Sequence, residues 1–185
     1  MNDIIEFYHG TSDLFNKIDV SKGKGHKDFG KGFYFTTLEQ QAISWAKTKQ
    51  KFNYSFFKQG GTAYIYKFKL DLSETKIKNL NIKKFFLDTK ESKLEWIDFI
   101  IMCRLSNETP HNYDLVIGPT TDSDTKRLIQ DFLEKENKNT ENYNSLKLEL
   151  IKELKPENLK NQYFISKQEI LDYLIIPRSL RAYTR

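Results

Sequence analysis

At 185 residues the chain is long enough to bury the core of one domain, and its 14% of aromatic residues exclude a disordered protein. A net charge of +5 comes from 30 basic and 25 acidic residues scattered along the chain, which fits either a nucleic-acid or phosphate partner or a genome rich in lysine codons. No apolar run approaches the ~18 residues of a membrane span and no signal peptide is recognisable, so we expect a cytoplasmic protein.

Apolar periodicity and turn residues divide the chain into short strands and helices. In chain order the first half predicts a strand at 4–9, a helical turn at Leu14 and Phe15, a glycine-rich loop at 19–32, a strand at 32–36, a helix over 38–50 capped by Thr37, and a strand at 62–70. The second half predicts a helix at 91–105, a strand at 113–118, a helix opened by Ser123 and Asp124, a charged loop at 134–145, helices at 146–155 and 168–173, strands at 162–166 and 173–177, and a basic tail from Arg178.

The order of these elements lacks the βαβ rhythm of a doubly wound fold. It therefore predicts a single α+β domain, residues 1–185, with a mainly antiparallel sheet. The Gly-x-Gly tripeptides at 23–25 and 30–32 do not form a dinucleotide-binding fingerprint. Cys103 lies in an apolar run, so we expect a core thiol, and a single cysteine excludes a disulfide within the chain.

Two short segments near the N-terminus carry the clearest functional signal. Residues 7–11 read Phe-Tyr-His-Gly-Thr, and residues 29–36 read Phe-Gly-Lys-Gly-Phe-Tyr-Phe-Thr. Each predicts a strand tied to a glycine turn, and each presents one polar ring, that of His9 or Tyr34. A third segment at 114–119, Asp-Leu-Val-Ile-Gly-Pro, predicts a buried strand.

With these segments in this order, the chain resembles the ADP-ribosyltransferase superfamily, on the branch of diphtheria toxin and the poly(ADP-ribose) polymerases. Within it, the chain is similar to a family of small uncharacterised bacterial domains. The resemblance implies split, mainly antiparallel β-sheets with peripheral helices. It also implies NAD as co-substrate. Contact with a membrane is not expected, because no apolar run is long enough to span one.

His9 matches the first position of the superfamily's His-Tyr-Glu triad, where the imidazole binds the adenosine ribose and orients NAD. The resemblance also implies that Gly10, without a side chain, lets the backbone approach the nicotinamide carboxamide. Thr11 takes the position of a serine hydroxyl that touches the same amide. The alternative for His9 is a histidine that caps a turn at the end of a strand.

Tyr34 matches the tyrosine of the triad, whose ring stacks on the nicotinamide because its electron-rich face attracts a pyridinium cation. Trp45, eleven residues later, matches an aromatic residue that closes the other side of the nicotinamide in the polymerases. The glycines around Lys31, Gly32 among them, suggest backbone contact with a ligand. The alternative is that Tyr34 and Trp45 are core residues.

The third triad position departs from the superfamily pattern. Residues 161–163 read Asn-Gln-Tyr and resemble the Asn-Glu-Tyr of the polymerases, so Gln162 replaces the glutamate. Its amide can hold the 2′-hydroxyl of the nicotinamide ribose, but it supplies neither a general base nor a negative charge. Losing one such electrostatic contact typically costs about 10²–10³ in rate. Five nearby carboxylates lack the motif position and are given no role as base: Asp114, Asp122, Asp124, Glu169 and Asp172.

The loop between the first two motifs is rich in lysine. It carries Lys22, Lys24, Lys27 and Lys31 where the superfamily often folds a segment over the NAD donor. A cationic, glycine-rich loop can pair with a pyrophosphate, and a solvated loop is the alternative. His26 and His111 have no partners at metal-ligand spacing, so no metal site is expected.

The expected function is that of an NAD-dependent mono-ADP-ribosyltransferase, which breaks the nicotinamide–ribose bond and transfers ADP-ribose to an unidentified protein, nucleic acid or small molecule. NAD hydrolysis is a side activity of such enzymes. Members of the superfamily often act as bacterial toxins or defence effectors, and a toxin would have a neutralising partner protein. Two alternatives remain: a catalytically weak NAD or ADP-ribose-binding module, and a basic nucleic-acid-binding domain.

Overall fold

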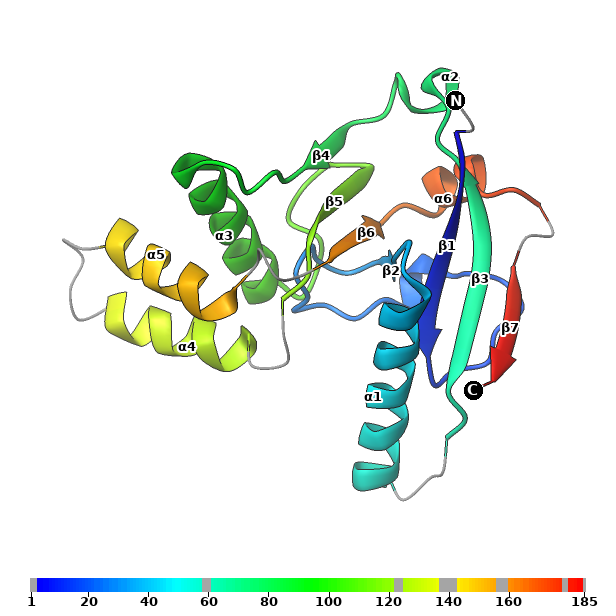
Figure 1. Ribbon diagram of the computed structural model, residues 1–185, viewed down its shortest axis with the longest axis horizontal. Coiled ribbons are helices and arrows are strands. Elements are labelled where there is room, and N and C mark those ends of the chain that lie inside the picture. Colours follow the sequence, from blue (N-terminus) through cyan, green and yellow to red (C-terminus); the bar gives the residue numbers. More distant parts are fainter. Residues whose placement is uncertain are drawn as a thin grey trace.

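The computed structural model describes residues 3–57, 61–121, 125–136, 143–155, 160–177 and 180–184. Two mostly antiparallel β-sheets lie at the centre and helices lie around them, which confirms the expected α+β class (Figure 1). The helix start expected at Ser123 and Asp124 lies outside the described residues, as does Asp122.

The strands are β1 (Ile4–Thr11), β2 (Phe33–Phe35), β3 (Tyr64–Asp71), β4 (Ile82–Lys84), β5 (Leu115–Pro119), β6 (Asn161–Ile165) and β7 (Arg181–Thr184). The helices are α1 (Glu39–Phe57), α2 (Glu74–Ile77), α3 (Lys90–Leu105), α4 (Thr125–Glu136), α5 (Tyr143–Leu154) and α6 (Gln168–Leu174), with a short 3₁₀ helix, η1 (Val20–Lys22).

The first sheet has the order β1-β3-β7 and contains the N-terminal motif. β1 and β3 pair antiparallel along their full length. Side chains alternate along β3 as the sequence predicts, so Phe68 and Leu70 are buried while Lys69 is exposed. One face of this sheet looks toward the second sheet, and α1 covers the other (Figure 1).

The second sheet has the order β2-β6-β5-β4 and contains the other two motifs. β6 pairs antiparallel with both β2 and β5, while β4 and β5 run parallel. Tyr34 lies opposite Phe164, and Gly118 lies opposite Gln162. Because side chains alternate along a strand, Gln162 and Phe164 share one face of the sheet.

β2 joins the two sheets. Its three residues pair with β6, and the next residue, Thr36, forms an antiparallel bridge to Tyr8 of β1. Two backbone hydrogen bonds make this bridge: the Tyr8 amide donates to the Thr36 carbonyl at 2.7 Å, and the Thr36 amide donates to the Tyr8 carbonyl at 3.0 Å. The bridge fixes the end of β1 next to β2.

Apolar side chains fill the space on both sides of β2. Phe33 and Phe35 enter a cluster between the sheets that also holds Phe7 of β1. Tyr34 faces the other way, toward a cluster formed with α3, α4 and α5 that contains Phe29 and other buried side chains. Cys103 is fully buried, as expected, and burial raises the pKa of its thiol to about 12.

Several elements of the chain differ from expectation. The strand predicted at 173–177 is wrong, because α6 continues to Leu174 and only Ile175 bridges to Leu70. The last strand is instead β7, which lies within the predicted basic tail. It forms by pairing with β3 although its residues are mostly polar. The helical turn expected at Leu14 and Phe15 does not form, and α2 and β4 were not expected.

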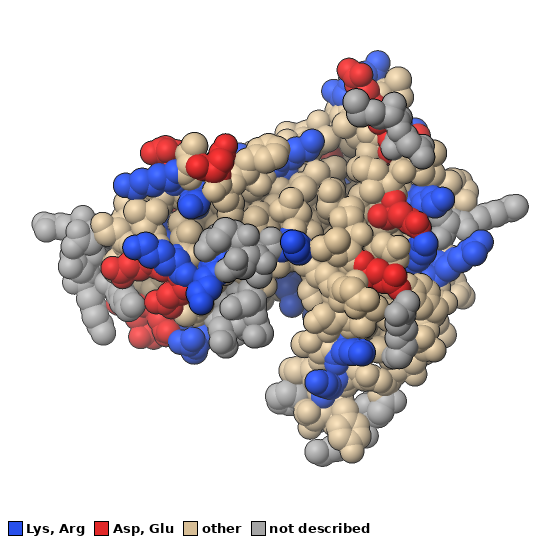
Figure 2. Space-filling model, viewed as in Figure 1, with Lys and Arg blue, Asp and Glu red and all other residues tan. Residues whose placement is uncertain are grey.

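Charged side chains of both signs are interspersed on the face drawn in Figure 2, and they form no single basic stripe there. The same view shows a notch between the lobe that carries α4 and α5 and the lobe formed by α1. Among the described residues no helix combines the length and apolar character that crossing a membrane requires.

Gly10 allows α1 to pack directly on β1. A Cβ at this position would lie 1.8 Å from the carbonyl oxygen of Ala42, a backbone atom that cannot move without shifting the helix. We therefore expect Gly10→Ala to lower the free energy of unfolding by about 1–3 kcal/mol, the usual cost of overpacking. Chemical denaturation would measure this. Gly61→Ala is the matched control, because its Cβ would meet no atom closer than 3.8 Å; equal effects of the two substitutions would contradict the packing role.

Candidate functional site

His9 lies near the end of β1 and contacts β2 in two ways. Its Nδ1 is 2.6 Å from the backbone carbonyl oxygen of Tyr34, and its ring stacks on that of Phe33 with centroids 4.5 Å apart. Burial of the imidazole, followed by the positive charge of Lys49, lowers the pKa of His9 to about 3. The imidazole is therefore neutral at physiological pH.

The contact with Tyr34 also determines which nitrogen of His9 carries the proton. A carbonyl oxygen only accepts, so Nδ1 must donate, and in a neutral imidazole Nε2 is then an acceptor. No hydrogen bond to Nε2 occurs within the part of the chain that the structure describes. His9 thus offers a fixed acceptor to a ligand hydroxyl, rather than a positive charge.

Lys49 of α1 lies beside His9. Its Nζ donates a hydrogen bond to the Gly10 carbonyl oxygen at 3.1 Å. Desolvation lowers the pKa of Lys49 to about 8; the Asp13 carboxylate acts in the opposite direction, and the positive charges of Lys27 and Lys24 add to the lowering. These three lysines come from α1 and from the glycine-rich loop, and we call them the lysine cluster. These positive charges repel one another, so the lysine cluster favours an anionic ligand whose negative charge would offset them.

Trp45 precedes Lys49 by one turn of α1, so the two side chains share one face of the helix. The Trp45 side chain is half-buried and belongs to none of the three apolar clusters formed by the described residues. Its ring contacts no other aromatic ring within the same described residues. A core role for Trp45 is therefore not needed to explain the packing.

Tyr34 is more involved in the protein's own structure than the sequence indicates. Its hydroxyl donates to the Gly30 carbonyl oxygen at 2.7 Å and accepts from the Phe29 amide at 2.9 Å. Its ring centroid lies 4.8 Å from that of Phe164. The ring points away from the side of β2 that carries Phe33 and His9, so His9 meets Tyr34 only at the backbone.

The other residues expected to bind NAD have structural roles. The side chain of Thr11 is buried and its hydroxyl accepts from the Asp13 amide at 3.2 Å. Gly32 packs on β6, where a Cβ would lie 2.6 Å from the Ile165 carbonyl oxygen. Lys31 forms an ion pair with Glu108 at 3.3 Å and is not part of the lysine cluster.

Gln162 is buried and belongs to a polar network that the sequence did not reveal. Its Nε2 donates to the Asp28 carboxylate at 2.7 Å. Asp28 also binds Arg104 and Thr121. Burial alone would raise the pKa of Asp28, but the Arg104 guanidinium and the donors on Thr121 and Gln162 lower it, so this carboxylate is ionised.

The sequence indicated no carboxylate beside Gln162, yet Asp28 lies against it, with both oxygens occupied by protein donors. Asp28 lies in the glycine-rich loop, far in sequence from the three residues that bind it, and nothing in the local pattern indicates such partners. The positive charge of Arg104 lowers the pKa of Lys27 and the negative charge of Asp28 raises it. The charges of Lys27 and Lys24 in turn lower the pKa of Lys49. The loop therefore connects the polar network with the lysine cluster and His9.

The other nearby carboxylates have partners of their own. Asp114 binds Lys167 at 2.5 Å, and Asp172 accepts from Gln168 at 2.9 Å. His26 Nδ1 donates to the Arg104 carbonyl oxygen at 3.0 Å, and His111 Nε2 donates to the Phe29 carbonyl oxygen at 2.9 Å. Within the described part of the chain no group of three or more histidine, cysteine, aspartate or glutamate side chains could hold a metal ion.

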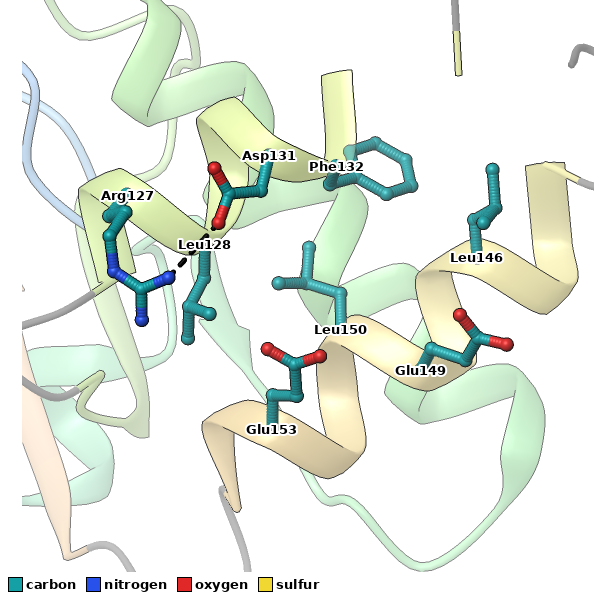
Figure 3. A pocket seen from close by; sticks show the side chains of 8 residues that line it. All are labelled: Arg127, Leu128, Asp131, Phe132, Leu146, Glu149, Leu150 and Glu153. Carbon is teal, nitrogen blue, oxygen red and sulfur yellow. Dashed lines mark hydrogen bonds and ion pairs between the residues drawn. The ribbon is translucent and has the colours of Figure 1, made fainter. Parts of the chain in front are cut away.

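Two hollows lie outside this region. One, of about 270 Å³, lies between α4 and α5, where Leu128, Phe132 and Leu150 form an apolar floor and Glu149 and Glu153 line its side (Figure 3). The other, of about 570 Å³, is lined by residues 14–19, Lys22 and Gln168. His9, Tyr34 and Gln162 line neither of them.

The low pKa of His9 gives a testable dependence of stability on pH. Between about pH 6.5 and pH 3 the unfolded chain binds a proton at His9 and the folded protein does not, so folding becomes less favourable as the pH falls through this range. The slope due to His9 approaches about 1.4 kcal/mol per pH unit. Unfolding by denaturant at several pH values would measure it, and His9→Gln should remove this contribution.

Lys49→Met tests the electrostatic part of the same effect. Removing the ammonium charge should raise the pKa of His9, which NMR titration of the imidazole Cε1 proton would report. An unchanged pKa would mean that burial alone keeps His9 neutral. Lys84→Met is the control, because Lys84 is exposed on β4 and does not contribute to the pKa of His9.

Comparison with models of known protein families gives one match, covering residues 5–175, to a family described as "Protein of unknown function (DUF3990)". No curated protein and no solved structure matches the chain. The match includes all three motifs and every residue of the site described above. The chain belongs to the DUF3990 family of proteins of unknown function.

Proposed function

We propose that the protein is an NAD-dependent mono-ADP-ribosyltransferase. The observation that carries this proposal is the pairing of a neutral histidine acceptor with the lysine cluster. His9 presents Nε2 to a hydroxyl, while Lys24, Lys27 and Lys49 present positive charge beside it. A ribose hydroxyl next to a phosphate offers this combination of a hydrogen-bond donor and a negative charge. A dinucleotide carries two riboses and two phosphates.

The remaining residues agree with such a ligand. Trp45 lies on the helix face that carries Lys49, half-buried and outside the apolar clusters, so it can stack on a flat base. Gln162 is held in the polar network, to which Lys27 is electrostatically coupled. The resemblance of the three motifs to ADP-ribosyltransferases supports NAD as the dinucleotide.

The reaction follows from the chemistry of NAD. The bond between the nicotinamide nitrogen and C1′ of the ribose breaks, and its electron pair leaves with nicotinamide. An oxygen or nitrogen of the acceptor forms the new bond at C1′ and loses its proton to water. His9 and the lysine cluster hold the donor, and Gln162 accepts a hydrogen bond from the ribose, so binding and orientation contribute most of the catalysis.

A second candidate, a module that binds NAD or ADP-ribose without turnover, is favoured by one observation. Among the described residues, Asp28 is the carboxylate that contacts Gln162, and both of its oxygens are used by protein donors, so it is not free to act as a general base. Calorimetry together with an assay of nicotinamide release separates the two candidates. Tight NAD binding without nicotinamide release would favour the module.

Labelling of a cell lysate tests the transferase. Purified wild type should release nicotinamide from NAD and transfer labelled ADP-ribose to components that mass spectrometry identifies. We expect His9→Ala to reduce labelling at least about tenfold, the loss that follows from removing about 1.4 kcal/mol of binding. Tyr34→Ala should reduce labelling as well, because it removes the packing and hydrogen bonds that hold β2 beside His9. Tyr54→Ala, an exposed tyrosine on α1, is the control. Equal labelling by all four proteins would reject this site, and no labelling or nicotinamide release by wild type would reject the transferase.

The lysine cluster predicts a binding site that depends on salt and pH. Lys49→Ala and Lys27→Ala should each weaken NAD binding about two- to fivefold, as expected for one partly exposed ion pair, and reduce its sensitivity to salt. Binding to wild type should also weaken as the pH rises through about 8, where Lys49 loses its charge. Lys84→Ala is the control, and calorimetry at two salt concentrations is the measurement. Affinities that match wild type in both variants would place the phosphates elsewhere.

A further inference from the structure

The carboxylate of Asp28 is fully occupied by protein donors. Its Oδ1 accepts from Arg104 Nε at 2.9 Å and from the Thr121 hydroxyl at 2.6 Å. Its Oδ2 accepts from the Thr121 amide at 3.0 Å and from Gln162 Nε2 at 2.7 Å. Arg104 also donates from its terminal nitrogen to the Thr121 hydroxyl. Three segments, those of Arg104, Thr121 and Gln162, therefore hold the buried charge of Asp28 in one position.

This arrangement fixes the orientation of the Gln162 amide. An ionised carboxylate only accepts hydrogen bonds, so the amide nitrogen of Gln162 must face Asp28 and the amide oxygen must face away. Gln162 Oε1 accepts no hydrogen bond from any residue that the structure describes. It is also not among the buried polar atoms that lack a partner, so some of its surface is open. The amide oxygen therefore has an acceptor position that no described residue uses, in a residue that is 4% exposed.

The same contact explains why position 162 holds an amide. A glutamate there would place a second carboxylate about one hydrogen-bond length from Asp28, and two like charges at that distance cannot both be ionised in a buried site. Position 162 and position 28 thus form a matched pair. The negative charge is on the loop, and the strand carries the neutral acceptor.

We propose that Asp28 is a positioning residue that holds the Gln162 amide with its oxygen toward the ligand, so that the site selects a ribosyl ligand by accepting a hydrogen bond from its hydroxyl. The proposal rests on the proposed function for the identity of the ligand. Asp28, Arg104 and Thr121 then contribute to specificity by positioning Gln162, and none of them contacts the ligand.

The first experiment tests the pairing without any ligand. Thermal unfolding should show that Gln162→Glu lowers the Tm, because it places a carboxylate against Asp28. Adding Asp28→Asn to this variant should restore a large part of the loss, since an amide can donate to the new carboxylate. A double variant no more stable than Gln162→Glu alone would overturn the matched pair.

The second experiment measures selectivity by calorimetry, with NAD and with an NAD analogue that lacks the 2′-hydroxyl of the nicotinamide ribose. Wild type should prefer NAD about three- to tenfold, the effect of one hydrogen bond. Gln162→Met should abolish the preference. Asp28→Asn should reduce it to a similar extent, and the double variant should show no further loss. Thr121→Val, which keeps the carboxylate but removes one donor to it, should have a smaller effect in the same direction and remains informative if Asp28→Asn does not fold.

Asp114→Asn is the matched control, because Asp114 also accepts from a backbone amide and a lysine, at a distance from Gln162. It should leave the preference unchanged. If wild type binds NAD and Asp28→Asn keeps the wild-type preference, the positioning role is wrong while the proposed function stands. If wild type binds neither dinucleotide, the proposed function fails and the ligand assigned to Gln162 fails with it, whatever the result of the stability test.

Discussion

The antiparallel bridge between Thr36 and Tyr8 is the contact on which the site depends. β2 is only three residues long, and it pairs with β6 before its next residue turns to β1. Two backbone hydrogen bonds at this point bring the end of β1 against β2, so that His9 reaches the Tyr34 carbonyl. A short strand cannot bury much surface by itself, and the apolar clusters on its two sides supply the packing that keeps it in place.

Electrostatics divide the site into two parts with different character. Beside His9, Lys24, Lys27 and Lys49 place three positive charges against the one carboxylate of Asp13, and the positive charges contribute to the low pKa of Lys49 and of His9. Around Gln162 the one buried negative charge, Asp28, is balanced by Arg104 and by hydrogen bonds. The first part can gain free energy from an anion, whereas the second is already neutralised and can offer only a neutral acceptor.

Local pattern was sufficient for most of the fold. The alternation along β3 and the helical period of α1 are patterns among residues that are close in sequence. Both elements form where they were expected, and α1 continues beyond the predicted end to Phe57. The pattern was wrong at the C-terminus, where a polar strand forms because β3 has a free edge. It also could not show that the missing side chain of Gly10 serves the packing of α1, since the carbonyl of Ala42 approaches it only in the folded protein.

By itself, the sequence determined the α+β class, the strands that carry His9 and Tyr34, and the absence of a carboxylate at position 162. Each of these depends on residue identity and on short periodicities, which act through neighbouring residues. Only the tertiary structure decided that His9 meets Tyr34 at its backbone, that Lys49 joins two lysines of the loop, and that Asp28 holds the amide of Gln162. These contacts join residues far apart in the chain, and their distances depend on how the two sheets and α1 pack together.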